Sequence, residues 1–112
     1  MKRALSMLGL CARAGKLISG EKACLQSIRS GGVYAVLLDA GAAKNAVKSI
    51  TDACTYHQVA LITAPEDALG NAIGKPGRMV VAVTDPGFAG RIIELSQNNS
   101  ANQSTIGGAL RE

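Results

Sequence analysis

The sequence predicts an α/β protein, a three-layer α-β-α sandwich with a mixed central sheet of about four strands. Three short apolar runs, VYAVLLD, VALIT and MVVAVT, contain β-branched residues and are bounded by turn residues, as expected for buried strands. Segments with helical spacing of apolar residues precede, separate and follow these runs. Because strands that alternate with helices form a sheet with helices on both faces, a layered sandwich follows.

The first helix is expected over residues 4–14, which are apolar almost all round and therefore predicted to be largely buried. KLIS, residues 16–19, could hold a short strand. A second helix is expected in EKACLQSIRS, because Ser19 is a favoured N-cap residue and Glu21 suits the positive end of the helix dipole. Gly31-Gly32 would end it, and its apolar side would consist of Cys24, Leu25 and Ile28.

The later elements follow from the same patterns. A third helix is expected over residues 42–56, with one apolar side formed by Ala43, Val47, Ile50 and Cys54. Pro65 favours the start of a short helix in PEDALGNAI, and GKPGR is typical of a tight loop. A last helix after DPG would direct Phe88, Ile92 and Leu95 inward. Residues 1–96 are expected to form one domain, and the polar residues 97–112 a disordered tail.

Composition restricts the class of protein. The chain has 112 residues, enough for one domain, and no apolar run reaches the ~20 residues that a membrane span requires. Its three cysteines are widely spaced and lack a CxxC pattern, which argues against a disulfide framework or a zinc site and predicts buried thiols. We therefore expect a cytoplasmic monomer with no metal, no cofactor and no membrane partner.

Catalytic motifs are not found. GLCARAGKL resembles a phosphate-binding Walker A loop, but five residues rather than four separate its two glycines, and Leu17 stands where Ser or Thr would hold Mg²⁺. The sequence has no GxGxxG, GxSxG or HExxH, and its aspartates fall at turns. The chain is therefore expected not to be an enzyme.

Charge points to a polyanionic partner. The net charge is +4, and residues 1–34 carry six Lys or Arg residues against a single Glu. Tyr34, Tyr56 and Phe88, the only aromatic residues, fall within apolar patterns and are expected in the core. Stacking of single-stranded bases on exposed aromatic rings is therefore not expected.

The stretch RAGKLISGEK could receive such a partner at the start of the second helix. A helix that begins at Gly20 offers unpaired backbone amides, and the missing side chain lets another backbone approach. Lys22, Gln26 and Arg29 follow at helical spacing and form one polar face. An ordinary solvated helix has the same spacing, so the pattern alone leaves both interpretations open.

Four segments carry a family resemblance: RAGKLISGEKACLQSIRSGG, AKNAVKSITDAC, LG followed by IGK, and VVAVTDPGFAGRII. Across residues 3–96 they resemble the kink-turn RNA-binding ribosomal protein family of L7Ae/L30e type, and most of all its small bacterial YlxQ-type members. The resemblance implies an α-β-α sandwich that binds a kink-turn, an RNA duplex sharply bent at a bulge flanked by sheared G·A pairs. The resemblance makes ribosomal RNA one expected partner.

The resemblance also implies a set of binding residues. Gly20 would allow close approach of the RNA, Lys22 would contact guanine edges or a phosphate, and residues 73–79 would pack against extruded bulge nucleotides. The predicted RNA-binding residues are Arg13, Lys16, Gly20, Glu21, Lys22, Gln26, Arg29, Ala40, Lys44, Ile73, Lys75, Pro76 and Arg78.

Several positions depart from the family pattern. Short or neutral residues stand where many members have charged or polar ones: Ala23, Gln26, Asn71 and Ala40-Gly41. These departures keep a second hypothesis open, a protein-interaction or assembly module that retained the fold with a weakened RNA site. A third is the substrate-binding half of an RNA-modifying enzyme, although no catalytic domain is attached in this sequence.

Overall fold

The computed structural model describes the backbone of residues 1–104 and the side chains of residues 1–97. Five helices and four strands lie in this part of the chain. In order they are α1 (Lys2–Arg13), β1 (Leu17–Ser19), α2 (Glu21–Ser30), β2 (Ala35–Asp39), α3 (Lys44–His57), β3 (Ala60–Ala64), α4 (Ala68–Ile73), β4 (Val80–Val83) and α5 (Pro86–Ser104). The short strand suggested by KLIS is present as β1.

The strands form one mixed sheet in the order β1-β4-β2-β3. β2 and β3 are parallel, whereas β4 runs antiparallel to both of its neighbours, β1 and β2. All five residues of β2 are buried, as expected for the continuous apolar run that contains it. The mixed sheet of four strands agrees with the prediction.

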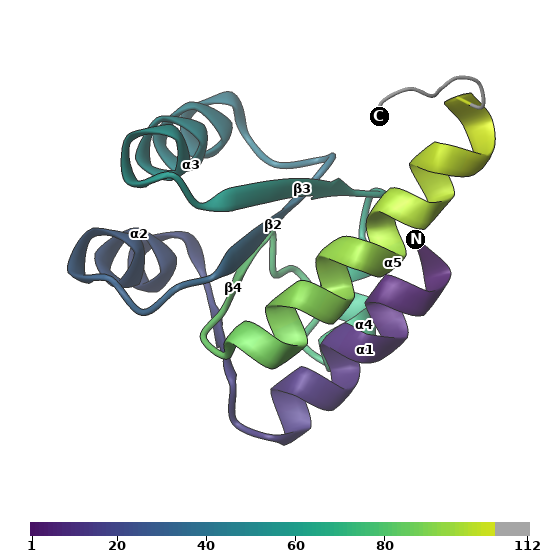
Figure 1. Ribbon diagram of the computed structural model, residues 1–112. Coiled ribbons are helices and arrows are strands. Elements are labelled where there is room, and N and C mark those ends of the chain that lie inside the picture. Colours follow the sequence, from purple (N-terminus) through teal and green to yellow (C-terminus); the bar gives the residue numbers. More distant parts are fainter. Residues whose placement is uncertain (105–112) are drawn as a thin grey trace.

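Helices cover both faces of the sheet. Figure 1 shows α1, α4 and α5 on one face and α2 and α3 on the other. Because side chains alternate along a strand, Leu37 packs with Leu8 and Ile92 in one core cluster, and Val36 packs with Ile28 and Ile50 in the other. The α-β-α sandwich is therefore confirmed.

Two helices are more exposed than the sequence predicted. In α1 only Ala4, Leu8 and Cys11 are fully buried, and Leu10 is 49% exposed, so the prediction of a helix buried on nearly all sides was wrong. In α3 the buried stripe is Ala46, Ile50 and Cys54, whereas Val47 is 37% exposed. Each helix meets the sheet on one side only, so apolar residues outside that stripe remain in contact with solvent.

The tyrosines also correct the prediction of an aromatic core. Tyr34 is 47% exposed and Tyr56 83% exposed, whereas Phe88 packs against the core. Tyr34 precedes β2 at the end of the sheet, and Tyr56 lies in the last turn of α3, outside its buried stripe. The ring of Tyr56 meets that of His57 edge-on, with centroids 4.9 Å apart.

The last helix extends further than its apolar pattern. α5 continues to Ser104, into the segment for which we expected a disordered tail beginning at residue 97. Extending a helix adds one hydrogen bond per residue fixed and needs no new nucleus, so a polar continuation of an anchored helix is inexpensive. Residues 105–112, the rest of the expected tail, lie outside the described residues.

Two further findings concern membrane spans and metal sites. Within residues 1–104 every helix is too short or too polar to span a bilayer. The described residues also contain no cluster of three or more His, Cys, Asp or Glu side chains placed to hold a metal ion.

The three cysteines are free and buried. Burial, with a smaller effect of nearby Asp85, raises the pKa of the Cys11 thiol from 9.0 to about 11. Burial, with a smaller effect of nearby Cys54, raises the pKa of Cys24 to about 12, and burial also raises the pKa of Cys54. The Cys11 and Cys24 thiols contact the backbone oxygens of Lys16 and Ile18 at 3.2 and 3.6 Å, which joins α1 and α2 to the segment around β1.

These thiols predict a loss of stability at alkaline pH. The folded pKa values lie above the unfolded value of 9.0, so the stabilising contribution is complete below pH 9 and is lost as pH rises through 11. We expect the free energy of unfolding, measured with urea at pH 8, 10 and 11, to fall by about 2 kcal/mol for each of these two thiols over that range. A variant with Cys11→Ala and Cys24→Ala should show a shallower pH dependence. An equal slope in both proteins would exclude the thiols as its cause.

Candidate nucleic-acid interface

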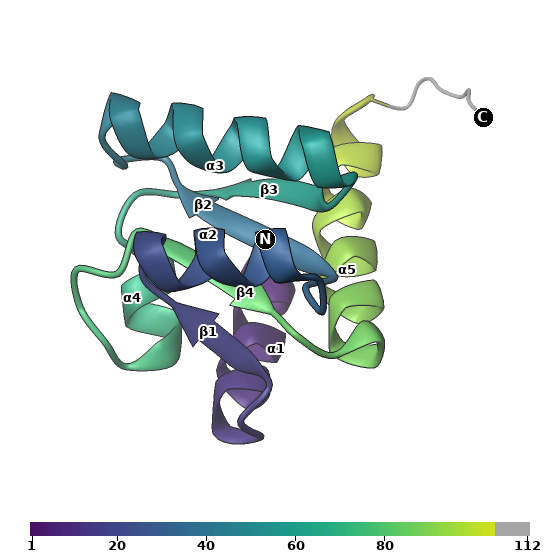
Figure 2. The same cartoon turned by 90° about the vertical axis from the view of Figure 1, so that its left-hand side faces the viewer.

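Three separate segments meet at one end of the sheet. The amide of Gly20 donates to the carbonyl of Val80 over 2.9 Å, and the amide of Asp39 donates to that of Met79 over 2.8 Å. The start of β4 is therefore held between the start of α2 and the end of β2. Figure 2 shows the starts of α2 and α3 and the loop between α4 and β4 gathered at the left-hand end of the molecule. We call residues 20–22, 40–44 and 73–78 the sheet-end surface.

The start of α2 has an uncapped set of backbone amides. Gly20 is the N-cap residue, with φ 101° and ψ 142°, and no side chain in the described part of the chain caps the helix. The prediction that Ser19 acts as the N-cap was wrong, because Ser19 is the last residue of β1 and pairs with Val81. The first-turn amides have no partner within the helix and carry the positive end of its dipole. This helix start can therefore accept a phosphate or a base-edge oxygen.

Gly20 is required by its backbone conformation. Its positive φ is rare for residues with a side chain, and an added Cβ would lie 3.2 Å from Nη1 of Arg78. The guanidinium of Arg78 thus lies beside the helix start. The two residues come from α2 and from the loop before β4, which are distant in sequence.

Asp39 holds the neighbouring loop. It is the only buried polar or charged residue in the described part of the chain, at 1% exposure. Its carboxylate accepts hydrogen bonds from the amide of Gly41 at 2.7 Å and from the amide of Asp67 at 2.8 Å. The first bond shapes the turn that contains Ala40, and the second joins that turn to the start of α4. Ala40 is exposed at this turn, at the sheet-end surface.

The loop between α4 and β4 is a tight turn pressed against α4. Pro76 and Gly77, with φ 88°, occupy the central positions, and the amide of Arg78 donates to the carbonyl of Lys75 over 3.3 Å, as in a type II turn. Gly70 lets this turn approach, because an added Cβ would lie 2.8 Å from the carbonyl oxygen of Lys75. Pro76 is exposed, whereas Ile73 is half-buried and packs against the core.

Exposed cations surround this surface. In the described part of the chain the ion pairs are Lys48–Asp52 and Arg91–Glu94, so the cations of the sheet-end surface have no such partner there. These cations are Lys22, Lys44, Lys75 and Arg78. Acidic residues also lie at this end of the molecule, namely Glu21, Glu66 and Asp67. The surface itself thus carries four cations and one acidic residue, and the other two acidic residues lie beside it.

The remaining predicted residues lie further away. The carbonyl of Lys16 accepts from the amide of Thr84 over 3.0 Å, which places Lys16 at the opposite end of β1, one loop beyond Arg13. Arg29 lies in the last turn of α2. It lines one shallow hollow together with Lys22 and Gln26, which confirms that the three share one helix face. The structure therefore gathers most of the predicted set at the sheet-end surface. Arg13, Lys16, Gln26 and Arg29 lie outside it.

Comparison with known proteins identifies the family. Residues 2–93 match the model of the ribosomal protein L7Ae/L30e/S12e/Gadd45 family. The chain belongs to this family. Within it the chain is YlxQ-like: it is 44% identical over 90 residues to the RNA-binding protein YlxQ of Bacillus subtilis (strain 168), a match that covers 80% of this chain and 90% of that protein. The RNA-binding protein YlxQ of Enterococcus faecium is 35% identical over 95 residues, 84% of this chain and 91% of that protein.

Solved structures of similar proteins have the same fold. A protein of unknown function from Bacillus halodurans matches with a TM-score of 0.83 and 34% identity, over 87% of this chain and 99% of that one. The Giardia lamblia 15.5kD RNA binding protein matches with a TM-score of 0.72 over 84% of each chain. Its identity is 19%, so this likeness shows the fold alone.

The Asp39 carboxylate predicts a stability effect. In Asp39→Asn the amide group can accept one of the two backbone bonds, and its NH₂ group would face the other backbone donor. We expect a loss of about 1–3 kcal/mol in the free energy of unfolding, measured with urea. Asp52→Asn, at an exposed carboxylate on α3, is the matched control and should stay within about 0.5 kcal/mol of the wild-type protein. Equal effects of the two substitutions would contradict the role assigned to Asp39.

Two helical glycines form a second matched pair. Gly70→Ala should destabilise the protein, because the new methyl group would displace the turn at residues 75–77. Gly90→Ala in α5 meets nothing within 4 Å and should stabilise it by about 0.4–1 kcal/mol, since alanine restricts the unfolded chain. Thermal and urea unfolding of both variants should therefore shift in opposite directions. A stabilised Gly70→Ala would show that the turn does not need this close approach.

Proposed function

We propose that the chain is a non-catalytic RNA-binding protein that recognises a kink-turn through its sheet-end surface. Membership of a ribosomal protein family and two relatives named as RNA-binding proteins support RNA as the partner. The observation that carries the proposal is the uncapped start of α2 at Gly20, beside Lys22 and Arg78. The family description makes ribosomal RNA the first natural RNA to test, and a cytoplasmic monomer remains the expected state.

Recognition would combine backbone and side-chain contacts. The first-turn amides of α2 would receive a phosphate or a base-edge oxygen, and Gly20 would let the RNA approach the backbone. Lys22 would contact guanine edges, for which a lysine ammonium is a suitable donor. Lys44, Lys75 and Arg78 would neutralise phosphates on either side of the bend. None of these steps requires an exposed aromatic platform, so recognition would depend on the shape of the RNA.

The neutral residues on the same surfaces favour one alternative. Ala23 and Gln26 on α2 and Asn71 on α4 provide fewer charges than many family members have at these positions. A protein-assembly module that kept the fold would bind its partner with little dependence on salt. Phosphate contacts instead produce a steep salt dependence. Salt titration therefore separates the two functions.

The test is a binding titration with a labelled RNA that contains a standard kink-turn. The control RNA replaces the G·A pairs with Watson–Crick pairs, and both are measured at two salt concentrations. We expect tighter, salt-dependent binding to the kinked RNA. Lys22→Ala should weaken that binding by about 1–3 kcal/mol, or 5- to 150-fold in Kd, and should affect the straight duplex much less.

Lys48→Ala is the matched protein control. Lys48 is an exposed lysine on α3 that pairs with Asp52, outside the sheet-end surface. Its removal should change both affinities by the same small factor. Equal weak binding of the wild-type protein to both RNAs would reject kink-turn recognition. An equal loss on both RNAs in Lys22→Ala would make Lys22 a nonspecific cation.

A further inference from the structure

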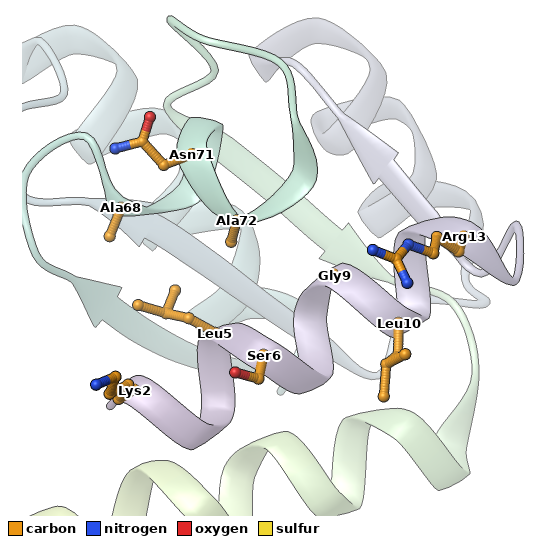
Figure 3. A pocket seen from close by; sticks show the side chains of 9 residues that line it. All are labelled: Lys2, Leu5, Ser6, Gly9, Leu10, Arg13, Ala68, Asn71 and Ala72. Carbon is orange, nitrogen blue, oxygen red and sulfur yellow. The ribbon is translucent and has the colours of Figure 1, made fainter.

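A groove lies between α1 and α4, beside the sheet-end surface. It has a volume of about 710 Å³, and its lining includes Lys2, Leu5, Leu10 and Arg13 from α1. Figure 3 shows Lys2 and Arg13 at opposite ends of this part of α1, with Ala72 of α4 pointing towards it, and Asn71 of α4 also lines the groove. Leu10, 49% exposed, is one of four large hydrophobic residues that are exposed in the described part of the chain.

The groove exists because α1 and α4 approach each other at a glycine. A Cβ added to Gly9 would lie 3.0 Å from the carbonyl oxygen of Ala72, so a larger residue would force the two helices apart. The half-buried Leu5 and Ala68 provide an apolar floor beside this contact. The groove is therefore a furrow between two packed helices, a shape suited to one extended strand rather than to a duplex.

The groove is continuous with the sheet-end surface. A second hollow of about 500 Å³ shares Gly9, Arg13, Asn71 and Ala72 with the first. It also reaches Gly74 and Lys75 in the turn before β4 and Ser19 at the end of β1. The two adjoining hollows thus offer a ligand at the sheet-end surface a path along α1. Arg13 lines both hollows. Although it lies at the end of α1, outside the sheet-end surface, this path therefore includes it in the candidate interface.

The charge of the groove is of one sign. Its cations are Lys2 and Arg13 along α1 and Lys75 at the sheet-end surface, and no acidic residue lines either hollow. None of the three forms an ion pair within the described part of the chain. Clefts lined by one sign of charge concentrate ligands of the opposite sign. The apolar floor between the cations would suit ribose and base surfaces between charged phosphates.

We propose that this groove holds a single-stranded segment of RNA that leaves the kinked region bound at the sheet-end surface. The inference rests on the proposed function and extends its footprint to α1 and α4. Lys2 and Arg13 are eleven residues apart, about 16 Å along the helix, which accommodates a few nucleotides rather than one. Arg13 and Lys2 contact phosphates, and Leu5 and Leu10 contact the sugars and bases between them.

The experiment compares a minimal kink-turn RNA with four versions that each carry a six-nucleotide single-stranded overhang on a different strand end. Kd is measured across a salt series for three proteins. These are the wild type, the groove variant Lys2→Gln with Arg13→Gln, and the control variant Lys48→Gln with Arg91→Gln. The control removes the same charge from two exposed positions outside the groove.

For the wild type, one overhang should tighten binding and steepen the slope of log K against log salt by about 1.4, the value for two single-strand phosphate contacts. The groove variant should lose this gain, so that its Kd for the overhang RNA equals its Kd for the minimal RNA. The control variant should keep the gain. No gain in the wild type with any overhang, or the same gain in the groove variant, would overturn the inference. Either result would make the groove a candidate for a protein segment instead.

A separate comparison, of the minimal kink-turn with its Watson–Crick control, tests the proposed function independently of the groove. If the wild type does not prefer the minimal kink-turn over its Watson–Crick control, kink-turn recognition fails. The overhang strand alone, offered as a free oligonucleotide, then decides the groove inference. Salt-dependent binding that the groove variant loses would support it, and absence of binding would overturn it.

Discussion

The buried carboxylate of Asp39 is the interaction on which the geometry of the sheet-end surface depends. It lies at the end of β2, the central strand, and accepts backbone hydrogen bonds from two different loops. Hydrogen bonds to a charged group contribute about 1.5–3 kcal/mol each when both partners are present. The turn after β2 and the start of α4 are therefore both fixed to the same strand. The turn before β4 packs against α4, so its position depends on the same carboxylate.

Close backbone approach is the second constraint, and it explains why glycines rather than charged residues shape this surface. Gly70 admits the turn before β4, Gly9 admits α4 against α1, and Gly20 leaves the start of α2 open. At Gly70 and Gly9 a methyl group would press on a backbone carbonyl oxygen, whereas at Gly20 the positive φ disfavours any side chain. The result is a surface whose shape comes from the main chain and whose charge comes from lysines and arginines placed around it. Such a surface agrees with the proposed recognition of a kink-turn by its shape.

Much of the fold and part of the candidate site were predictable from local patterns. The strands that contain Val36 and Val81 are short apolar runs, and the α2 face of Lys22, Gln26 and Arg29 follows from helical spacing alone. Solvent exposure was less predictable, because Leu10 and Tyr56 lie in apolar sequence yet face away from the sheet. How much of a helix surface is covered depends on how many neighbouring elements pack against it. A single sequence does not specify this number.

The sequence by itself determined the order of helices and strands, the buried central strand and the glycine at the start of α2, because each depends on residues within a few positions of one another. Only the tertiary structure decided which cations lie together. The three-residue strand β1 places Lys16 at the opposite end of the sheet from Gly20, whereas Arg78, 58 positions from Gly20 in the sequence, lies beside it. The groove between α1 and α4 likewise exists only once Gly9 meets Ala72. Strand order and helix packing bring distant segments together, and no local spacing encodes those distances.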